Sequence, residues 1–227
     1  MLNKFIERLK IEASFFSNKK SHQFSIDPTL RNLSKKYEDI DAYLDFHISS
    51  RKKLSLDTNT QLIFPGKIKT GSSYKSIKRR LLNPLAEYST NGLFNTDILF
   101  YNLKYQGFKA KIEFHFYEKK LFYIDCNLGE ISFDDRKEIL DELIIHYSIH
   151  GIEPATHKIT DHKGQTLCIE SVDSFRIIMA DSGNSFFTEL SKIEIFYNRK
   201  QSSNIREKAV FTAIEPKTAF TAVKSTG

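Results

Sequence analysis

The feature that most constrains the fold is a two-strand pattern in the stretch GFKAKIEFHFYEKKLFYIDCNL, residues 107–128. Apolar and polar residues alternate through residues 108–117, a charged Glu-Lys-Lys turn follows, and residues 121–128 continue the extended pattern. A period of two places successive side chains on opposite faces of a strand. The sequence therefore predicts an antiparallel hairpin with one apolar face.

The two faces of the first hairpin strand differ in chemistry. One face carries Phe108, Ala110, Ile112, Phe114 and Phe116, and we expect it to be buried. The other face, here called the polar face, carries Lys109, Lys111, Glu113, His115 and Tyr117. Because a rigid sheet face with tyrosine and charge suits a protein interface, we expect the polar face to meet water or a partner.

Helical spacing of apolar residues appears in four other places. Apolar residues three or four apart predict helices over residues 3–16 and 35–48. A third helix follows Ser72 or Ser73 as its cap and ends at Asn83-Pro84, and a fourth covers residues 134–154 with Asp134 as its cap. The polar segment 50–60 reads as a loop.

Further strands are predicted over residues 97–105, 155–161, 165–171, 174–181 and 190–198. Together these elements predict an α+β fold in which an antiparallel sheet is covered on one face by helices. The sheet either consists of two divergent helix-plus-meander halves or is one large sheet with two covering helices. The expected segments are an N-terminal helical segment (1–56), two α/β repeats (57–131 and 132–200) and a tail (201–227).

Composition places the chain among globular proteins with a core that needs no disulfides. It has 227 residues, a formal net charge of +6 and only two cysteines, Cys126 and Cys168. The cysteines lie in strand-like runs outside any Cys-x-x-Cys pair, and no apolar stretch is long enough for a signal peptide or a membrane span. We therefore expect a cytoplasmic protein that does not enter a membrane.

The stretch GSSYKSIKRRLLNP, residues 71–84, resembles the Gly-Ser/Thr…Val/Ile…Leu-Gly-x-Pro helix of small two-layer α/β repeats. Such repeats build the β-lactamase-inhibitory proteins and the bacterial outer-membrane-assembly lipoproteins. In both, a meander follows with a Gly/Asn-Lys-Leu turn, to which EKKLFYI is similar. Residue 82 is Leu where that pattern has Gly, and no lipobox cysteine is present. The chain also looks like cytoplasmic immunity proteins that accompany bacterial toxins.

Two patterns imitate metal chemistry. His146 and His150 lie four apart on a predicted helix, with His157 and His162 nearby, but the helix lacks the glutamate of a metalloprotease. Asp97 and the run Glu118-Lys119-Lys120 imitate the Asp…Glu-x-Lys order of a metal-dependent nuclease. That run lies at a hairpin tip, where side chains diverge into solvent. We therefore expect no metal, no other cofactor and no catalytic residue.

A basic helix start is the remaining candidate site. Ser72 and Ser73 precede a helix whose solvent side carries Lys75, Lys78, Arg79 and Arg80, so an anion could bind its free N–H groups. The spacing of a nucleotide-binding loop is absent.

These observations leave three hypotheses for the function. The first is a non-enzymatic bacterial immunity protein that neutralises a cognate toxin by occluding it, as the resemblance to inhibitory proteins implies. The second is a nucleic-acid-associated basic protein, and the third is an enzyme of unrecognised type. The identity of the target and the oligomeric state stay open.

Overall fold

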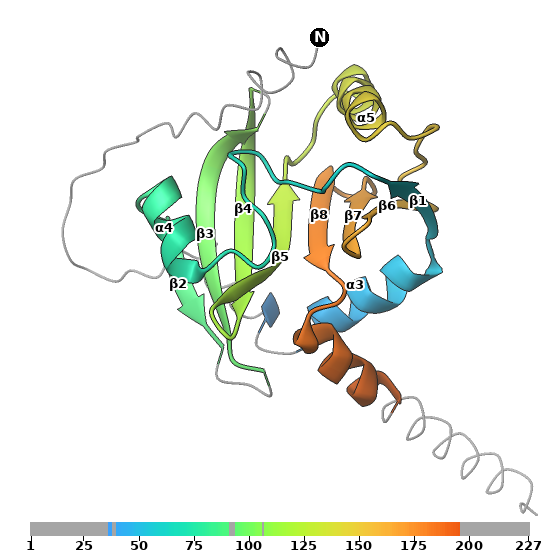
Figure 1. The fold of residues 1–227 in the computed structure, drawn as a ribbon. Coiled ribbons are helices and arrows are strands. Elements are labelled where there is room, and N and C mark those ends of the chain that lie inside the picture. Colours follow the sequence, from blue (N-terminus) through green and yellow to red (C-terminus); the bar gives the residue numbers. More distant parts are fainter. Residues whose placement is uncertain (1–35, 38–39, 91–93, 106, 196–227) are drawn as a thin grey trace, which may run out of the picture. The chain divides into compact units, whose positions relative to one another are not determined.

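A computed structural model describes residues 36–37, 40–90, 94–105 and 107–195 of the chain. The chain divides into two compact units, residues 1–188 and 189–227. The first unit contains one eight-stranded sheet in the order β1-β6-β7-β8-β5-β4-β3-β2 (Figure 1). The predicted α+β fold with an antiparallel sheet is confirmed; the parallel pair β1·β6 at one edge departs from the antiparallel pattern.

Along the chain, one helix and one short strand are followed by two runs of strands, and a helix precedes each run. After α3 (Asp41–Lys52) and β1 (Leu54–Thr58), helix α4 (Tyr74–Leu81) precedes four strands, which are β2 (Ala86–Ser89), β3 (Thr96–Tyr105), β4 (Phe108–Tyr117) and β5 (Lys120–Asn127). Helix α5 (Phe133–Tyr147) then precedes β6 (His157–Asp161), β7 (Gln165–Glu170) and β8 (Arg176–Asp181). The two runs of strands meet where β5 pairs with β8.

One sheet face packs against α4 and α5. Both helices contribute to a continuous apolar core, through Ile77 and Leu81 of α4 and through Ile139, Leu143 and Tyr147 of α5. The predicted apolar face of β4 belongs to this core, with Phe108 partly buried and the other four residues fully buried: Ala110, Ile112, Phe114 and Phe116. Burial of this face is therefore confirmed.

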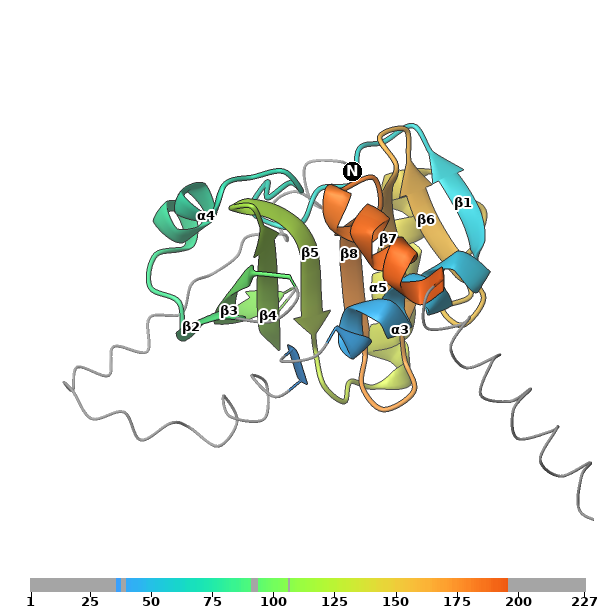
Figure 2. The same ribbon diagram turned by 90° about the horizontal axis from the view of Figure 1, so that it is seen from below.

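The opposite sheet face is also covered over part of its area. Helix α3 places Tyr43 and Phe46 against Tyr123 of β5, with ring centroids 5.7 and 5.2 Å apart. The ring of Phe186, which follows β8, packs tilted against that of Phe122 of β5, with centroids 4.3 Å apart. In Figure 2, α3 lies across the part of the sheet that contains β8, β7 and β6. The expectation of helices on one face alone is therefore wrong, because α3 forms a third cover.

Several predicted elements differ from the structure. The predicted loop 50–60 contains the last turn of α3 and the short edge strand β1, and a run of five strand residues gives too weak a period to identify from sequence. Residues 185–195 form a helix in place of the predicted strand 190–198, whose last residues lie outside the described ranges. The cap of α5 is Ser132, whose Oγ accepts from the Asp135 N–H at 3.1 Å, instead of Asp134.

The predicted helix 3–16 and the tail 201–227 lie outside the described residues. In the part of the chain that the structure covers, no helix is long and apolar enough to cross a membrane.

Helix α4 ends at a strained residue. Leu82 has φ 60° and ψ −139°, a combination that an L residue with a Cβ rarely adopts, and the related pattern has Gly at this position. Its side chain is 50% exposed. We expect Leu82→Gly to raise the free energy of unfolding by about 1 kcal/mol, since relief of strain outweighs the higher entropy of unfolded Gly. Urea denaturation measures the change, and Leu82→Ala, which keeps the Cβ, should show no gain.

Candidate functional site

The structure divides the predicted polar face of β4 into an exposed part and a buried part. Lys109 and Lys111 are exposed and Tyr117 is half-buried. Glu113 and His115 are 7% and 0% exposed, so the expectation that the whole face meets solvent or a partner is wrong. Two of the five predicted partner-binding residues are therefore inaccessible in this structure.

Residues N-terminal to and within α3 account for the burial of Glu113 and His115. The Tyr37 hydroxyl donates to Glu113 Oε2, and the Tyr43 hydroxyl lies 2.8 Å from His115 Nδ1. The Tyr37 and His115 rings meet edge to face with centroids 4.6 Å apart. Their partners come from distant parts of the chain, so no local sequence pattern could reveal this cover.

The charges next to this buried pair are also matched within the chain. Arg176 of β8 binds both carboxylate oxygens of Asp125 and donates from Nη1 to Glu170 Oε2 at 2.5 Å. Lys36 Nζ lies 3.3 Å from Asp125 Oδ2. Burial alone would raise the pKa of Asp125, but its hydrogen bond to Arg176 and the charges of Lys36 and Arg176 outweigh that effect and lower it. The cluster therefore holds an ionised carboxylate inside the fold.

His115 is held in its neutral form. Burial lowers the pKa of His115, although Glu113, whose Oε2 lies 3.4 Å from Nε2, acts in the opposite direction. Burial also raises the pKa of the Tyr43 hydroxyl. A hydroxyl that keeps its proton can donate to Nδ1, and the ring proton is then carried by Nε2. Nε2 itself has no hydrogen-bond partner among the described residues.

This burial predicts a loss of stability in acid. Because the folded pKa of His115 lies below the unfolded value of about 6.5, the unfolded chain binds a proton that the folded chain excludes. The stability that His115 contributes is present above about pH 6.5 and is lost as pH falls toward its folded pKa. We expect a slope of up to about 1.4 kcal/mol per pH unit in this window.

The measurement is the free energy of unfolding by urea from pH 8 to pH 5. His115→Asn keeps a polar partner for Tyr43 but cannot titrate, so its slope should be smaller than that of the unaltered chain. Equal slopes in the two proteins would show that His115 does not titrate on unfolding in this window.

The exposed part of the polar face is a cationic block. In the sheet register, Lys104 lies opposite Lys109, and Asn102 lies opposite Lys111. Lys109, Lys111 and Asn102 are exposed and Lys104 is half-exposed. The surface formed by Lys104, Lys109 and Lys111 is here called the lysine block. Like charges directly opposite one another destabilise a strand pair, and an acidic partner would reduce this repulsion. The lysine block is therefore suited to an acidic partner.

The structure places the residues of the two patterns that imitate metal chemistry in ordinary surroundings, within the part of the chain that it describes. His146 is half-buried against the Tyr147 ring, and His157 Nδ1 accepts from the Glu153 N–H at 3.0 Å. Asp97 pairs with Lys119 at 2.6 Å instead of meeting a second carboxylate. Among the described residues, no group of three His, Cys, Asp or Glu side chains is arranged to hold a metal.

The two thiols are buried as predicted for core residues. Burial raises the pKa of Cys126 and raises that of Cys168 to about 11, so both stay protonated at neutral pH. A protonated, buried thiol is a poor nucleophile.

The predicted anion site at the start of α4 is partly occupied by the chain itself. Ser73 Oγ accepts from the Ser76 N–H at 3.2 Å, and the Tyr74 N–H donates to the Lys119 carbonyl at 3.1 Å. Lys78 pairs with Glu87 at 2.6 Å. Of the residues named for this site, Lys75 and Arg79 are exposed and Ser72 is half-buried. Anion binding here stays a prediction, with fewer donors than the sequence implied.

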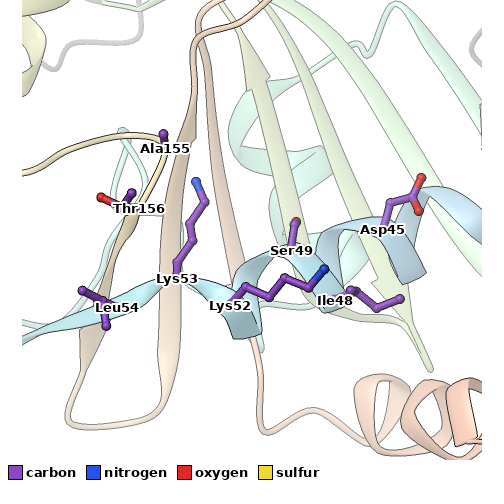
Figure 3. A pocket seen from close by; sticks show the side chains of 8 residues that line it. All are labelled: Asp45, Ile48, Ser49, Lys52, Lys53, Leu54, Ala155 and Thr156. Carbon is purple, nitrogen blue, oxygen red and sulfur yellow. The ribbon is translucent and has the colours of Figure 1, made fainter.

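A surface depression of about 680 Å³ lies where α3 passes into β1. It is lined by Asp45, Ile48, Ser49, Lys52, Lys53, Leu54, Ala155 and Thr156 (Figure 3). Lys53 Nζ donates to the carbonyls of Pro154 and Ile169, at 2.5 and 3.0 Å. With one exposed acid and two lysines, of which one is already bound to backbone, the depression lacks a convergent set of catalytic groups.

Comparison with models of protein families, with curated proteins and with solved structures found no match to this chain.

Proposed function

We propose that this chain is a non-enzymatic binding protein that attaches to an acidic surface of another protein through the lysine block. The single observation that carries the proposal is that Lys104, Lys109 and Lys111 lie together on the same face of two paired strands. Lys109 and Lys111 are exposed and Lys104 is half-exposed. The paired strands fix the backbone positions from which these three lysine side chains extend, so a complementary acidic patch gains attraction without ordering flexible loops.

The arrangement of the other ionisable groups supports binding over catalysis. Glu113, His115 and Asp125 are buried and contact partners inside the fold. A catalytic group has to reach a substrate, and these groups lie beneath Tyr37 and α3.

A protein partner fits the surface better than a nucleic acid. Single strands bind by stacking bases on exposed aromatic rings, whereas Tyr101 and Tyr105 of β3 and Tyr123 of β5 are buried. On the basic helix α4, Lys78 is paired with Glu87, and Arg80 donates to the carbonyls of Gly66 and Lys67.

The specific form that we propose is a bacterial immunity protein that occludes a toxin in the cytoplasm. The two helix-then-strand runs support it, since they agree with the resemblance to inhibitory α/β repeats, and two buried free thiols suit a reducing compartment.

The test compares what co-purifies from the native host with three tagged proteins. These are the unaltered chain, Lys109→Glu/Lys111→Glu, and the control Lys137→Glu/Lys163→Glu, which has the same net charge and alters two exposed lysines elsewhere. We expect the control to co-purify as much of a protein partner as the unaltered chain does. The lysine-block variant should co-purify at least about 90% less of it, because each Lys→Glu change turns attraction into repulsion at the centre of the interface.

The immunity role needs a second result. The partner expressed alone should stop growth, and co-expression of the unaltered chain should restore it. Co-purifying nucleic acid that nuclease removes, or a partner held equally by both variants, would contradict the proposal.

A further inference from the structure

Three polar side chains, Asp161, Gln165 and Asp181, continue the core face of the sheet at the end that holds the β6–β7 turn. Because side chains alternate between the two faces of a strand, a residue shares its face with the residue two positions away. In β6, β7 and β8, the core members two positions away are Ile159, Leu167 and Met179. The three polar side chains therefore lie on the core face.

Gln165 lies between the two aspartates, because β7 lies between β6 and β8. On one side it pairs directly with Asp181, a position that brings the two Cβ atoms to about 5 Å. On the other side its N–H donates to Asp161 Oδ1 at 3.0 Å. The three side chains thus form one row across neighbouring strands.

The side-chain oxygen of Gln165 lacks a partner in this row. Gln165 is 6% exposed, and its Oε1 is buried without a hydrogen-bond donor among the described residues. An unpaired buried acceptor is costly, so proteins normally satisfy it with a donor, a water molecule or an ion.

Asp161 brings a buried carboxylate to the row. It is 4% exposed, and it accepts backbone N–H groups from Leu62, Lys163 and Gln165 at 2.9, 2.8 and 3.0 Å. In the part of the chain that the structure covers, no lysine, arginine or histidine side chain pairs with it. The three hydrogen bonds stabilise the ionised carboxylate but leave its charge unmatched. Buried charges are normally paired or coordinate a metal.

Asp181 brings a second carboxylate, which is half-buried. Its Oδ1 accepts from the Gly183 N–H at 3.2 Å, and it too has no cationic side chain as a partner within the described ranges. Burial and the charge of Asp161 raise the pKa of Asp181, so the two carboxylates are close enough to repel one another. Since Asp181 is partly exposed, an ion that keeps part of its water shell can reach it.

From this geometry we propose that Asp161, Gln165 and Asp181 bind a hard divalent cation, calcium or magnesium, through their side-chain oxygens. Two carboxylates and one amide carbonyl are ligands of the kind that these ions take, and water completes the coordination on the exposed side. The cation gives Gln165 Oε1 a partner, offsets two like charges and links the end of β8 to the β6–β7 turn. The site lies on the sheet face opposite the lysine block, so it can be tested independently of the proposed function.

The experiment is calorimetric titration of the chelator-treated full chain with CaCl2 and, separately, with MgCl2 at pH 7.5. We expect one ion per chain with a Kd below about 1 mM, as for a site with few protein ligands. Binding of either ion at one site supports the proposal, and the two affinities show which ion the site prefers.

Three variants locate the ion. Asp181→Asn removes one carboxylate and should weaken binding at least about tenfold. Asp173→Asn makes the same change at an exposed aspartate and should bind like the unaltered chain. Gln165→Glu adds a third carboxylate and should tighten binding about tenfold, because affinity rises with the charge of the ligands. Circular dichroism establishes that each variant is folded, and Asp181→Asn decides the result if Gln165→Glu is not.

No binding of either ion up to about 5 mM would overturn the proposal, since even weak calcium sites fill at that concentration. The Gln165 amide would then satisfy itself by turning its NH2 group toward a carboxylate. Equal affinities in Asp181→Asn and the unaltered chain would also overturn it, because the ion would then bind elsewhere.

Discussion

Phe186→Ala is expected to lower the free energy of unfolding by about 3–5 kcal/mol, the range for loss of a fully buried phenylalanine ring. The Phe186 side chain is 0% exposed. Its ring lies 4.3 Å from that of Phe122 on β5 and 4.9 Å from that of Tyr43 on α3. Truncation leaves a cavity between the sheet and α3, because neighbours fixed on a strand and a helix relax only partly.

The matched control is Phe133→Ala at the start of α5, where the phenylalanine is 79% exposed. The same chemical change there should alter stability by less than about 0.5 kcal/mol. Urea denaturation of both variants at pH 7.5 gives the comparison. Similar losses in the two variants would show that Phe186 does not seal the second sheet face.

The second large effect concerns the buried ion pair between strands β5 and β8. Arg176→Met should lower the free energy of unfolding by about 3 kcal/mol, because Asp125, which is 2% exposed, loses the guanidinium that binds both of its oxygens. Methionine keeps most of the side-chain volume, so the loss reports on charge more than on packing. Lys36 at 3.3 Å compensates only in part.

Two further variants separate the effect of the lost charge from that of the lost packing. Arg79→Met, on the exposed side of α4, makes the same substitution without a buried partner and should change stability by less than about 0.5 kcal/mol. Asp125→Asn combined with Arg176→Met removes both charges and should recover at least about 1 kcal/mol of the loss. A double variant at least as unstable as Arg176→Met alone would contradict this account, because removal of the unpaired carboxylate would then bring no gain.

Much of the sheet could be predicted from local patterns. Strand β4 covers residues 108–117 as predicted, because ten residues of alternating polarity specify both the strand and its buried face. The sequence also predicted the cap of α4 as Ser72 or Ser73, and in the structure it is Ser73, whose hydroxyl oxygen accepts from the Ser76 N–H. These features depend on residues close together in sequence.

The wrong predictions concern segments whose structure depends on distant partners. Strand β1 is short and gains its hydrogen bonds from β6, about a hundred residues later. Residues 185–195 include apolar residues that suit a strand, yet they form a helix. At the start of this helix, the Phe186 N–H donates to Asn184 Oδ1 at 3.0 Å. Intrinsic strand propensity is weak enough for such context to override it.

The candidate site shows the same division. The sequence identified Lys109 and Lys111 as outward residues of a strand, and they are exposed. It also assigned Glu113 and His115 to that surface, but Tyr37 and Tyr43 cover them. The polar character of a side chain predicts its face, and it does not predict whether another element supplies hydrogen bonds that permit burial.

The sequence by itself determined the α+β class, the central hairpin and the apolar face that α4 and α5 cover, because alternation and helical spacing are set by residues near one another. Only the tertiary structure decided that α3 covers part of the second face, that Asp125 and Arg176 pair inside the fold, and that β1 is the end strand of the sheet that the described residues form. Those outcomes depend on contacts between residues about 50 to 100 positions apart, which no local period records.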